Sequence, residues 1–186
     1  WSLSVAIVEA LNRELKNLSI PAAGSDRLIL TDHIAVQDLA ALGRFLLLPE
    51  DDLSLAAVLK SPLFGLDDMD LLEVARETDE KIRPGTLWQM LVKRSEASTK
   101  WQEVRRQLED WRARADFVPP YEFYARLLGA DGGRQAFRRR LGVEVDDVLD
   151  EFLALTIAYE QAGTPSLEGF LAWMAAAPTE IKREMT

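Results

Sequence analysis

The sequence predicts an all-α protein, an irregular multi-helix bundle of about ten helices. Apolar residues recur every three or four positions through most of the chain, the spacing that gives a helix one buried face. Proline and glycine interrupt this pattern at intervals that suit separate helices. No stretch carries a convincing signal for a hairpin or a βαβ unit. Together these observations favour helices over a sheet-based fold.

Start and stop signals bound most of the expected helices. The first helix ends near Ser19 because Pro21 disfavours a helical residue before it. Acidic residues at 50–52 and 67–68 open two helices, where they favour the positive end of the helix dipole. Thr164 or Ser166 caps the last one. The expected helices span residues 3–15, 33–47, 50–60, 67–77, 86–96, 98–115, 121–129, 134–142, 144–163 and 167–176.

Between the first two helices we expect a short extended piece, "RLILTD" at residues 27–32, with Thr31 or Asp32 as N-cap of the helix that follows. Pro62 to Gly65 is expected to form a corner. The segment after Gly24 is expected to make one compact bundle or two closely packed subbundles. The expected core residues are Leu39, Leu42, Phe45, Leu55, Val58, Leu59, Leu63, Phe64, Trp88, Trp101 and Trp173.

Composition and charge limit the possible functions. The absence of cysteine excludes disulfides and thiolate metal sites and fits a reducing compartment, so we expect a cytoplasmic protein. No apolar run approaches the ~20 residues of a membrane span, so no membrane partner is expected. A formal charge of -9 repels phosphate. Any nucleic-acid contact therefore has to come from local basic patches.

Candidate catalytic and metal-binding side chains are few. His33 is the only histidine, and beside Asp32 at a helix start it fits a surface cap better than a metal ligand or general base. The acidic clusters at 50–52, 67–70 and 146–147 each fall at an expected helix start, where negative charge is stabilising without a metal. No glycine loop is followed by Lys and Ser or Thr. We expect no catalytic residue, no metal and no cofactor here.

Two groups of arginines are candidates for phosphate contact. One, interleaved with Trp101 and Trp111, consists of Arg105, Arg106, Arg112 and Arg114. There we expect the tryptophans to pack inward while the arginines pair with Glu103, Glu109 and Asp110. The other follows a double glycine and is the stronger candidate. It consists of Arg134, Arg138, Arg139 and Arg140.

One long passage resembles a known family. "LTDHIAVQDLAALGRFLLLPEDDLSLAAVLKSPLFGLDDMDLLEVA", followed by "TLWQML" and "SLEGFLAWM", is similar to the helical insertion in the second motor lobe of superfamily 1 DNA helicases of the UvrD, Rep and RecB kind. It looks most like the AddA-type helicase-nuclease subunit that processes double-strand breaks. The resemblance covers nearly the whole chain. It implies that residues 1–24 end a RecA-like motor lobe and that residues 25–186 form the helical accessory subdomain, 2B.

The resemblance implies a non-catalytic piece of an ATP-dependent helicase that acts in double-strand-break repair and recombination. The ATP-binding loop and arginine fingers of such helicases lie outside this insertion, so ATP and Mg²⁺ would serve only the parent chain. The start at Trp1 without an initiator Met, and the uncapped charged end, fit a piece of a longer chain. The subdomain would contact double-stranded DNA or the partner nuclease subunit and regulate unwinding.

In UvrD-like relatives a loop of Gly-Ile-Gly type contacts the duplex, and residues 60–66 align with it. This chain keeps one glycine there and continues with Asp67 and Asp68, whose charges oppose a phosphate. The DNA-facing surface is therefore either this corner or the arginine group at 134–140. The candidate DNA contacts in the corner are Lys60, Ser61 and Gly65.

The alternative function for the whole chain is a free-standing α-helical protein-protein interaction module.

Overall fold

Helices make up most of the structure, a computed structural model that describes residues 30–78, 81–82, 85–163 and 165–184. The predicted all-α class is confirmed. None of the described helices combines the length and the apolar character needed to cross a bilayer. The expected helix at 3–15 and the proposed motor-lobe segment at 1–24 lie outside the described residues. The described helices are α3 (Ile34–Leu47), α4 (Asp52–Lys60), α5 (Asp68–Ala75), α6 (Leu87–Ser95), α7 (Thr99–Ala115), α8 (Pro120–Leu128), α9 (Gly133–Leu141), α10 (Val145–Gln161) and α11 (Leu167–Glu184).

The entry into α3 differs from the prediction. Residues 30–32 are helical, not extended. Leu30 is buried in the core, and its carbonyl accepts a hydrogen bond from the N–H of His33 (3.1 Å). His33 itself is the N-cap of α3, since its Nδ1 accepts from the N–H of Ala35 (3.2 Å). Thr31 and Asp32 were therefore the wrong cap residues, because burial of Leu30 keeps them in the preceding turn.

Two further boundaries differ from the prediction. Helix α5 ends at Ala75, and β1 (Arg76–Thr78) then pairs antiparallel with β2 (Lys81–Ile82). Arg94 Nη2 donates to the carbonyl of Arg76 (2.6 Å), so a side chain from α6 holds the first strand residue. Helix α11 continues to Glu184 rather than ending at residue 176.

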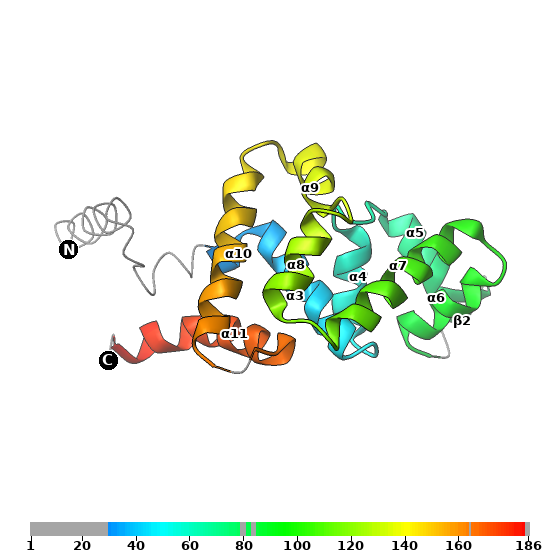
Figure 1. Cartoon of the computed structure of the whole chain (residues 1–186). Helices are drawn as coiled ribbons and strands as arrows, with labels where there is room; N and C mark the ends of the chain where they lie inside the picture. Colours follow the sequence, from blue (N-terminus) through cyan, green and yellow to red (C-terminus); the bar gives the residue numbers. More distant parts are fainter. Residues whose placement is uncertain (1–29, 79–80, 83–84, 164, 185–186) are drawn as a thin grey trace, which may run out of the picture.

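Helix α3 is the centre of the bundle. It packs against α4, α7, α10 and α11. In Figure 1, α10 stands on one side of α3 with α9 near one of its ends and α11 near the other, while α5, α6 and the strand pair lie on the opposite side. Both groups, one of α9, α10 and α11 and the other of α5, α6 and the strand pair, thus have α3 and α4 in common.

The predicted core residues lie in or against the core. Those fully buried are Leu39, Leu42, Phe45, Leu55, Val58, Leu59 and Trp101, and those half-buried against them are Leu63, Phe64, Trp88 and Trp173. The prediction missed an aromatic cluster from the second half of the chain. Tyr124 packs edge-to-face with Phe123 and Phe152, and its hydroxyl donates to the carbonyl of Leu39 (3.0 Å). This bond joins α8 to the backbone of α3.

Side chains also join helix ends that are distant in sequence. The carboxylate of Asp52 accepts a hydrogen bond from the N–H of Leu87 (2.6 Å), which lies in the first turn of α6. Trp101 Nε1 donates to Glu73 (2.9 Å) and Trp111 Nε1 to Asp131 (2.9 Å). Both tryptophans pack inward, as predicted, and each carries a polar link to another element.

We expect Leu59→Ala to lower the free energy of unfolding by about 2 to 5 kcal/mol, because Leu59 is 0% exposed and the truncation leaves a cavity. The measurement is urea unfolding of the chain. Leu53→Ala is the matched control, since Leu53 lies on the same helix and is 81% exposed. Equal stability of the two variants would contradict the assigned faces of α4.

Asp38, on α3, is only 8% exposed. Burial raises its pKa from 3.8 to about 6, although the nearby Arg140 acts in the opposite direction. A raised pKa means that the folded state favours the neutral acid, so the stability of the protein falls as pH rises from about 4 to about 6. Above that window the destabilisation is complete.

We therefore expect Asp38→Asn to be about 1 to 3 kcal/mol more stable than the parent chain at neutral pH and to match it below about pH 4. Urea unfolding across this pH range measures the difference. Glu103→Gln, an exposed site, is the control and should leave the pH profile unchanged. A difference that does not depend on pH would show that Asp38 does not titrate in this way.

Candidate nucleic-acid interface

Helix α9 carries the stronger arginine group and begins at a glycine turn. Gly132, its N-cap, has φ +80°, a left-handed conformation that a side chain would strain. Phe137 is fully buried and anchors the helix against the bundle. The basic side chains occupy the remaining faces of this short helix, close to α10 and to the corner after α4.

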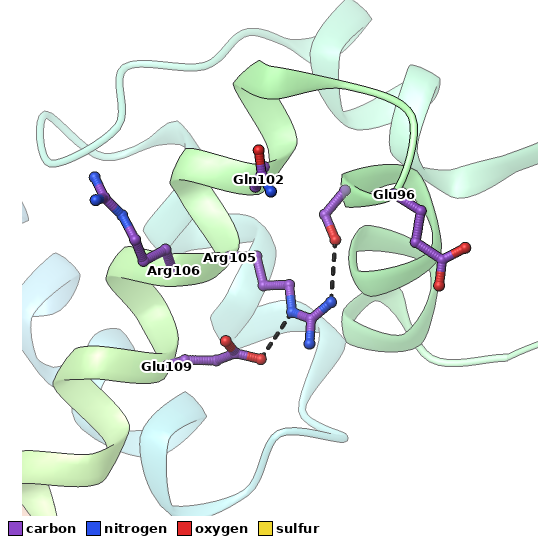
Figure 2. Close-up of a pocket in the computed structure, with 6 residues that line it drawn as sticks. Glu96, Gln102, Arg105, Arg106 and Glu109 are labelled. Atoms are coloured by element: carbon purple, nitrogen blue, oxygen red, sulfur yellow. Dashed lines mark hydrogen bonds and ion pairs between the residues drawn. The ribbon is translucent and has the colours of Figure 1, made fainter.

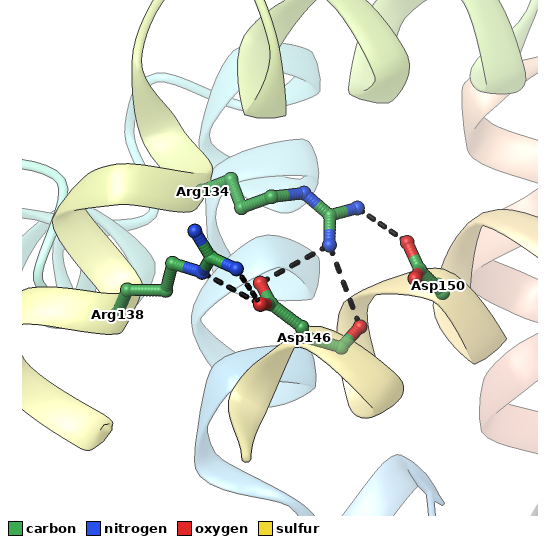
Figure 3. Close-up of polar contacts among 4 residues, drawn as sticks. All are labelled: Arg134, Arg138, Asp146 and Asp150. Atoms are coloured by element: carbon green, nitrogen blue, oxygen red, sulfur yellow. Dashed lines mark hydrogen bonds and ion pairs between the residues drawn. The ribbon is translucent and has the colours of Figure 1, made fainter. Parts of the chain in front are cut away.

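Two of these arginines are engaged by carboxylates of α10. Asp146 accepts from Arg134 Nη1 (3.2 Å) and from Arg138 Nε (2.6 Å), and Asp150 accepts from Arg134 Nη2. Figure 3 shows Asp146 between the two guanidinium groups. The hydrogen bond from Arg138, followed by that from Arg134, lowers the pKa of Asp146 although burial opposes the shift. Much of the positive charge of Arg134 and Arg138 is therefore compensated within the protein.

The other two arginines pair with no carboxylate of the described chain at salt-bridge distance. Arg139 Nε donates to the carbonyl of Gln135 within α9 (3.3 Å). Arg140 Nη1 donates to the carbonyl of Lys60 (2.9 Å), at the end of α4. The arginine group and the corner, which the sequence offers as alternative DNA-facing surfaces, thus meet at the contact between Arg140 and Lys60.

The corner at residues 60–66 has a compact, internally bonded backbone. Ser61 Oγ donates to the carbonyl of Val58 (2.6 Å), and the N–H of Gly65 donates to the carbonyl of Ser61 (2.7 Å). Gly65 has φ +66°, and a Cβ at this position would meet no atom within 4 Å, so the backbone conformation and not crowding favours glycine. Ser61 is buried and Lys60 is exposed. Of these side chains, Lys60 is the one best placed to reach a ligand.

The corner also brings a carboxylate to the surface. Lys60 Nζ pairs with Asp68 (2.6 Å), which is itself largely exposed. An exposed pair of this kind is weak and is exchanged readily for another anion. We define the cationic face as Lys60, Arg139 and Arg140. Within the part of the chain that the structure describes, Lys60 pairs only with the exposed Asp68 and Arg139 pairs with no carboxylate. Arg140 makes no salt bridge there, although the buried carboxylate of Asp38 is near enough to interact with its charge.

The second arginine group lies on α7 and is partly neutralised. Arg105 Nε donates to Glu109 (2.8 Å) and its Nη1 to the Ser95 hydroxyl (3.3 Å), beside a hollow of about 370 Å³. Figure 2 shows Arg106 directed away from this pair. Arg114 pairs with Asp110 and with Asp131. The predicted pairing is confirmed for Arg105 with Glu109 and for Arg114 with Asp110, whereas no ion pair of Glu103, Arg106 or Arg112 is seen among the described residues.

The acidic clusters have structural roles at helix starts. Asp51 caps α4 by accepting from the N–H of Ser54 (2.9 Å), and Asp67 forms a capping box with Asp70 at the start of α5. Asp146 binds arginines, as described above. Among the described residues, no three His, Asp or Glu side chains gather as a metal site requires. Ser166, one of the two predicted caps of the last helix, accepts from the N–H of Gly169 (3.0 Å).

Comparison with known proteins does not assign the chain to a family. No profile of a known protein family matches the chain, and no curated protein matches its sequence significantly.

We expect Asp146→Asn to lower the urea midpoint of unfolding at neutral pH, because it removes the negative charge between Arg134 and Arg138 and replaces one of the two acceptor oxygens with an NH2 donor. The pKa of Asp146 is lowered in the folded state, so its contribution is complete above the unfolded pKa, about 3.9, and is lost as pH falls through the folded value. The variant and the parent chain should therefore converge in acid.

Asp147→Asn is the matched control, an identical change at the next position of α10. It should leave the midpoint nearly unchanged at both pH values. If both variants lose the same stability, the effect belongs to the helix dipole and not to the arginine network.

Proposed function

We propose that this chain is the non-catalytic helical accessory subdomain of an ATP-dependent DNA helicase that acts in double-strand-break repair and recombination. The resemblance of residues 30–75 to the 2B insertion of AddA-type subunits is the starting point. One observation in the structure supports it. The corner that aligns with the duplex-contacting loop of the relatives lies against α9, where Arg140 contacts the carbonyl of Lys60 and the exposed Arg139 is the neighbouring residue of the same helix.

Electrostatics favours weak duplex binding through the cationic face. The chain carries a formal charge of -9, and the two arginines next to α10 are engaged by Asp146 and Asp150. About three phosphates can then be neutralised. Non-specific binding of this type has a Kd of about 10⁻⁴ to 10⁻⁶ M at physiological salt. We place the isolated chain at the weak end of this range.

In the parent protein the cationic face would add to the contacts made by the motor lobes. ATP and Mg²⁺ would bind to those lobes, and the subdomain would regulate unwinding through its hold on the duplex or on the partner nuclease subunit. Such a role requires no catalytic side chain in this segment. It also suits a protein of the cytoplasm.

The test is a titration of fluorescent duplex DNA at two salt concentrations. With three phosphates neutralised, affinity should fall roughly 40-fold between about 50 and 200 mM salt. Arg139→Glu should weaken binding and reduce the salt slope by about 1. Arg139 is preferred to Arg138 for this change because reversing Arg138 would place a carboxylate against Asp146.

Arg106→Glu is the matched control, an identical charge reversal at an exposed arginine of α7. It should weaken binding less than Arg139→Glu does. If the control has the larger effect, the duplex contact lies on α7. If binding is tight and insensitive to salt, the proposed cationic face is wrong.

A further inference from the structure

A groove lies where the C-terminal end of α3, the loop between α7 and α8, and the start of α11 meet. Its volume is about 350 Å³, room for one or two apolar side chains of a ligand. The apolar lining comes from all three segments. It includes Leu47, Phe117, Val118, Pro119 and Leu167.

Phe117 is the feature that separates this groove from an ordinary surface depression. Its side chain is 86% exposed, more than that of any other large apolar residue in the described chain. Leu47, which also lines the groove, is exposed as well. Single exposed apolar residues are common, but several that line one concave surface are typical of a binding site for a protein segment.

The groove is acidic as well as apolar. Asp116 and Glu168 belong to its lining, and no Lys, Arg or His does. Neither carboxylate pairs with a cation of the described chain. A second copy of this chain would bring its own net negative charge to the same place, so charge repulsion disfavours self-association there.

We propose that this groove binds a basic amphipathic segment of a partner protein, with apolar anchors against Phe117 and Leu167 and flanking Lys or Arg side chains beside Asp116 and Glu168. Apolar contact then supplies affinity, and the opposite charges supply selectivity. This inference is independent of the proposed DNA contact. The cationic face is on other elements and binds ligands of the opposite charge.

The probe is a fluorescein-labelled synthetic peptide of about twelve residues with leucine at helical spacing and lysine at the other positions. Fluorescence anisotropy with the 186-residue chain should show saturable binding that weakens with added salt. Phe117→Ser should weaken it about tenfold. The double change Asp116→Asn with Glu168→Gln should weaken it at low salt, which tests the groove without altering its apolar residues.

Two controls decide the interpretation. Leu53→Ser removes a similarly exposed apolar side chain from α4, and Glu103→Gln removes a charge from the second turn of α7. Both variants should bind the peptide as the parent chain does. The inference is overturned if Phe117→Ser binds normally, if the Leu53 and Phe117 variants are equally weakened, or if a peptide with glutamate in place of every lysine binds equally well. It is also overturned if sedimentation shows a dimer that Phe117→Ser dissociates.

Discussion

Burial of α3 on nearly all sides is the constraint on which the arrangement of the other helices depends. A helix can be surrounded in this way only if it is apolar around its circumference and its neighbours can approach closely. Small residues at 40, 41 and 43 provide that approach, and at Gly43 a side chain would collide with the Tyr124 hydroxyl and with Leu171. Because Tyr124 lies close to α3, its hydroxyl can donate a hydrogen bond to the carbonyl of Leu39. Contacts with α3 then fix the positions of α4, α7, α10 and α11.

Local sequence signals account for most of the fold, and long-range contacts account for what they missed. Periodicity predicted the described helices from α3 to α11, and the preference of acidic residues for helix starts placed residues 50–52 and 67–68 at the starts of α4 and α5. The turn at residues 30–32 escaped prediction because its helical form depends on burial of Leu30 against distant residues. The strand pair escaped because five residues carry little pattern and its first carbonyl is held by Arg94 from another helix.

The candidate DNA surface was predictable only in parts. Spacing of i to i+4 correctly paired Arg105 with Glu109, because both lie on one helix. This spacing rule gave no information on Arg134 and Arg138, because their partners are on α10. Nor did it inform on Arg140, whose acceptor is 80 residues away in sequence. Four similar arginines therefore have different surroundings. Only their tertiary contacts distinguish compensated charge from charge that remains available to a phosphate.

Helix α10 separates the two proposed binding surfaces. Its first turns hold Arg134 and Arg138 of α9, and its last turn leads to α11, whose start lines the acidic groove. Seventeen helical residues give α10 a length of about 25 Å, and α9, which carries Arg139 and Arg140, lies near the end of α10 opposite to α11. That distance exceeds the Debye length of about 8 Å at physiological salt, so the positive face and the acidic groove do not cancel each other's field. The two proposed ligands, a duplex and a basic protein segment, would therefore bind to separate surfaces of the molecule, each at the end that its charge favours.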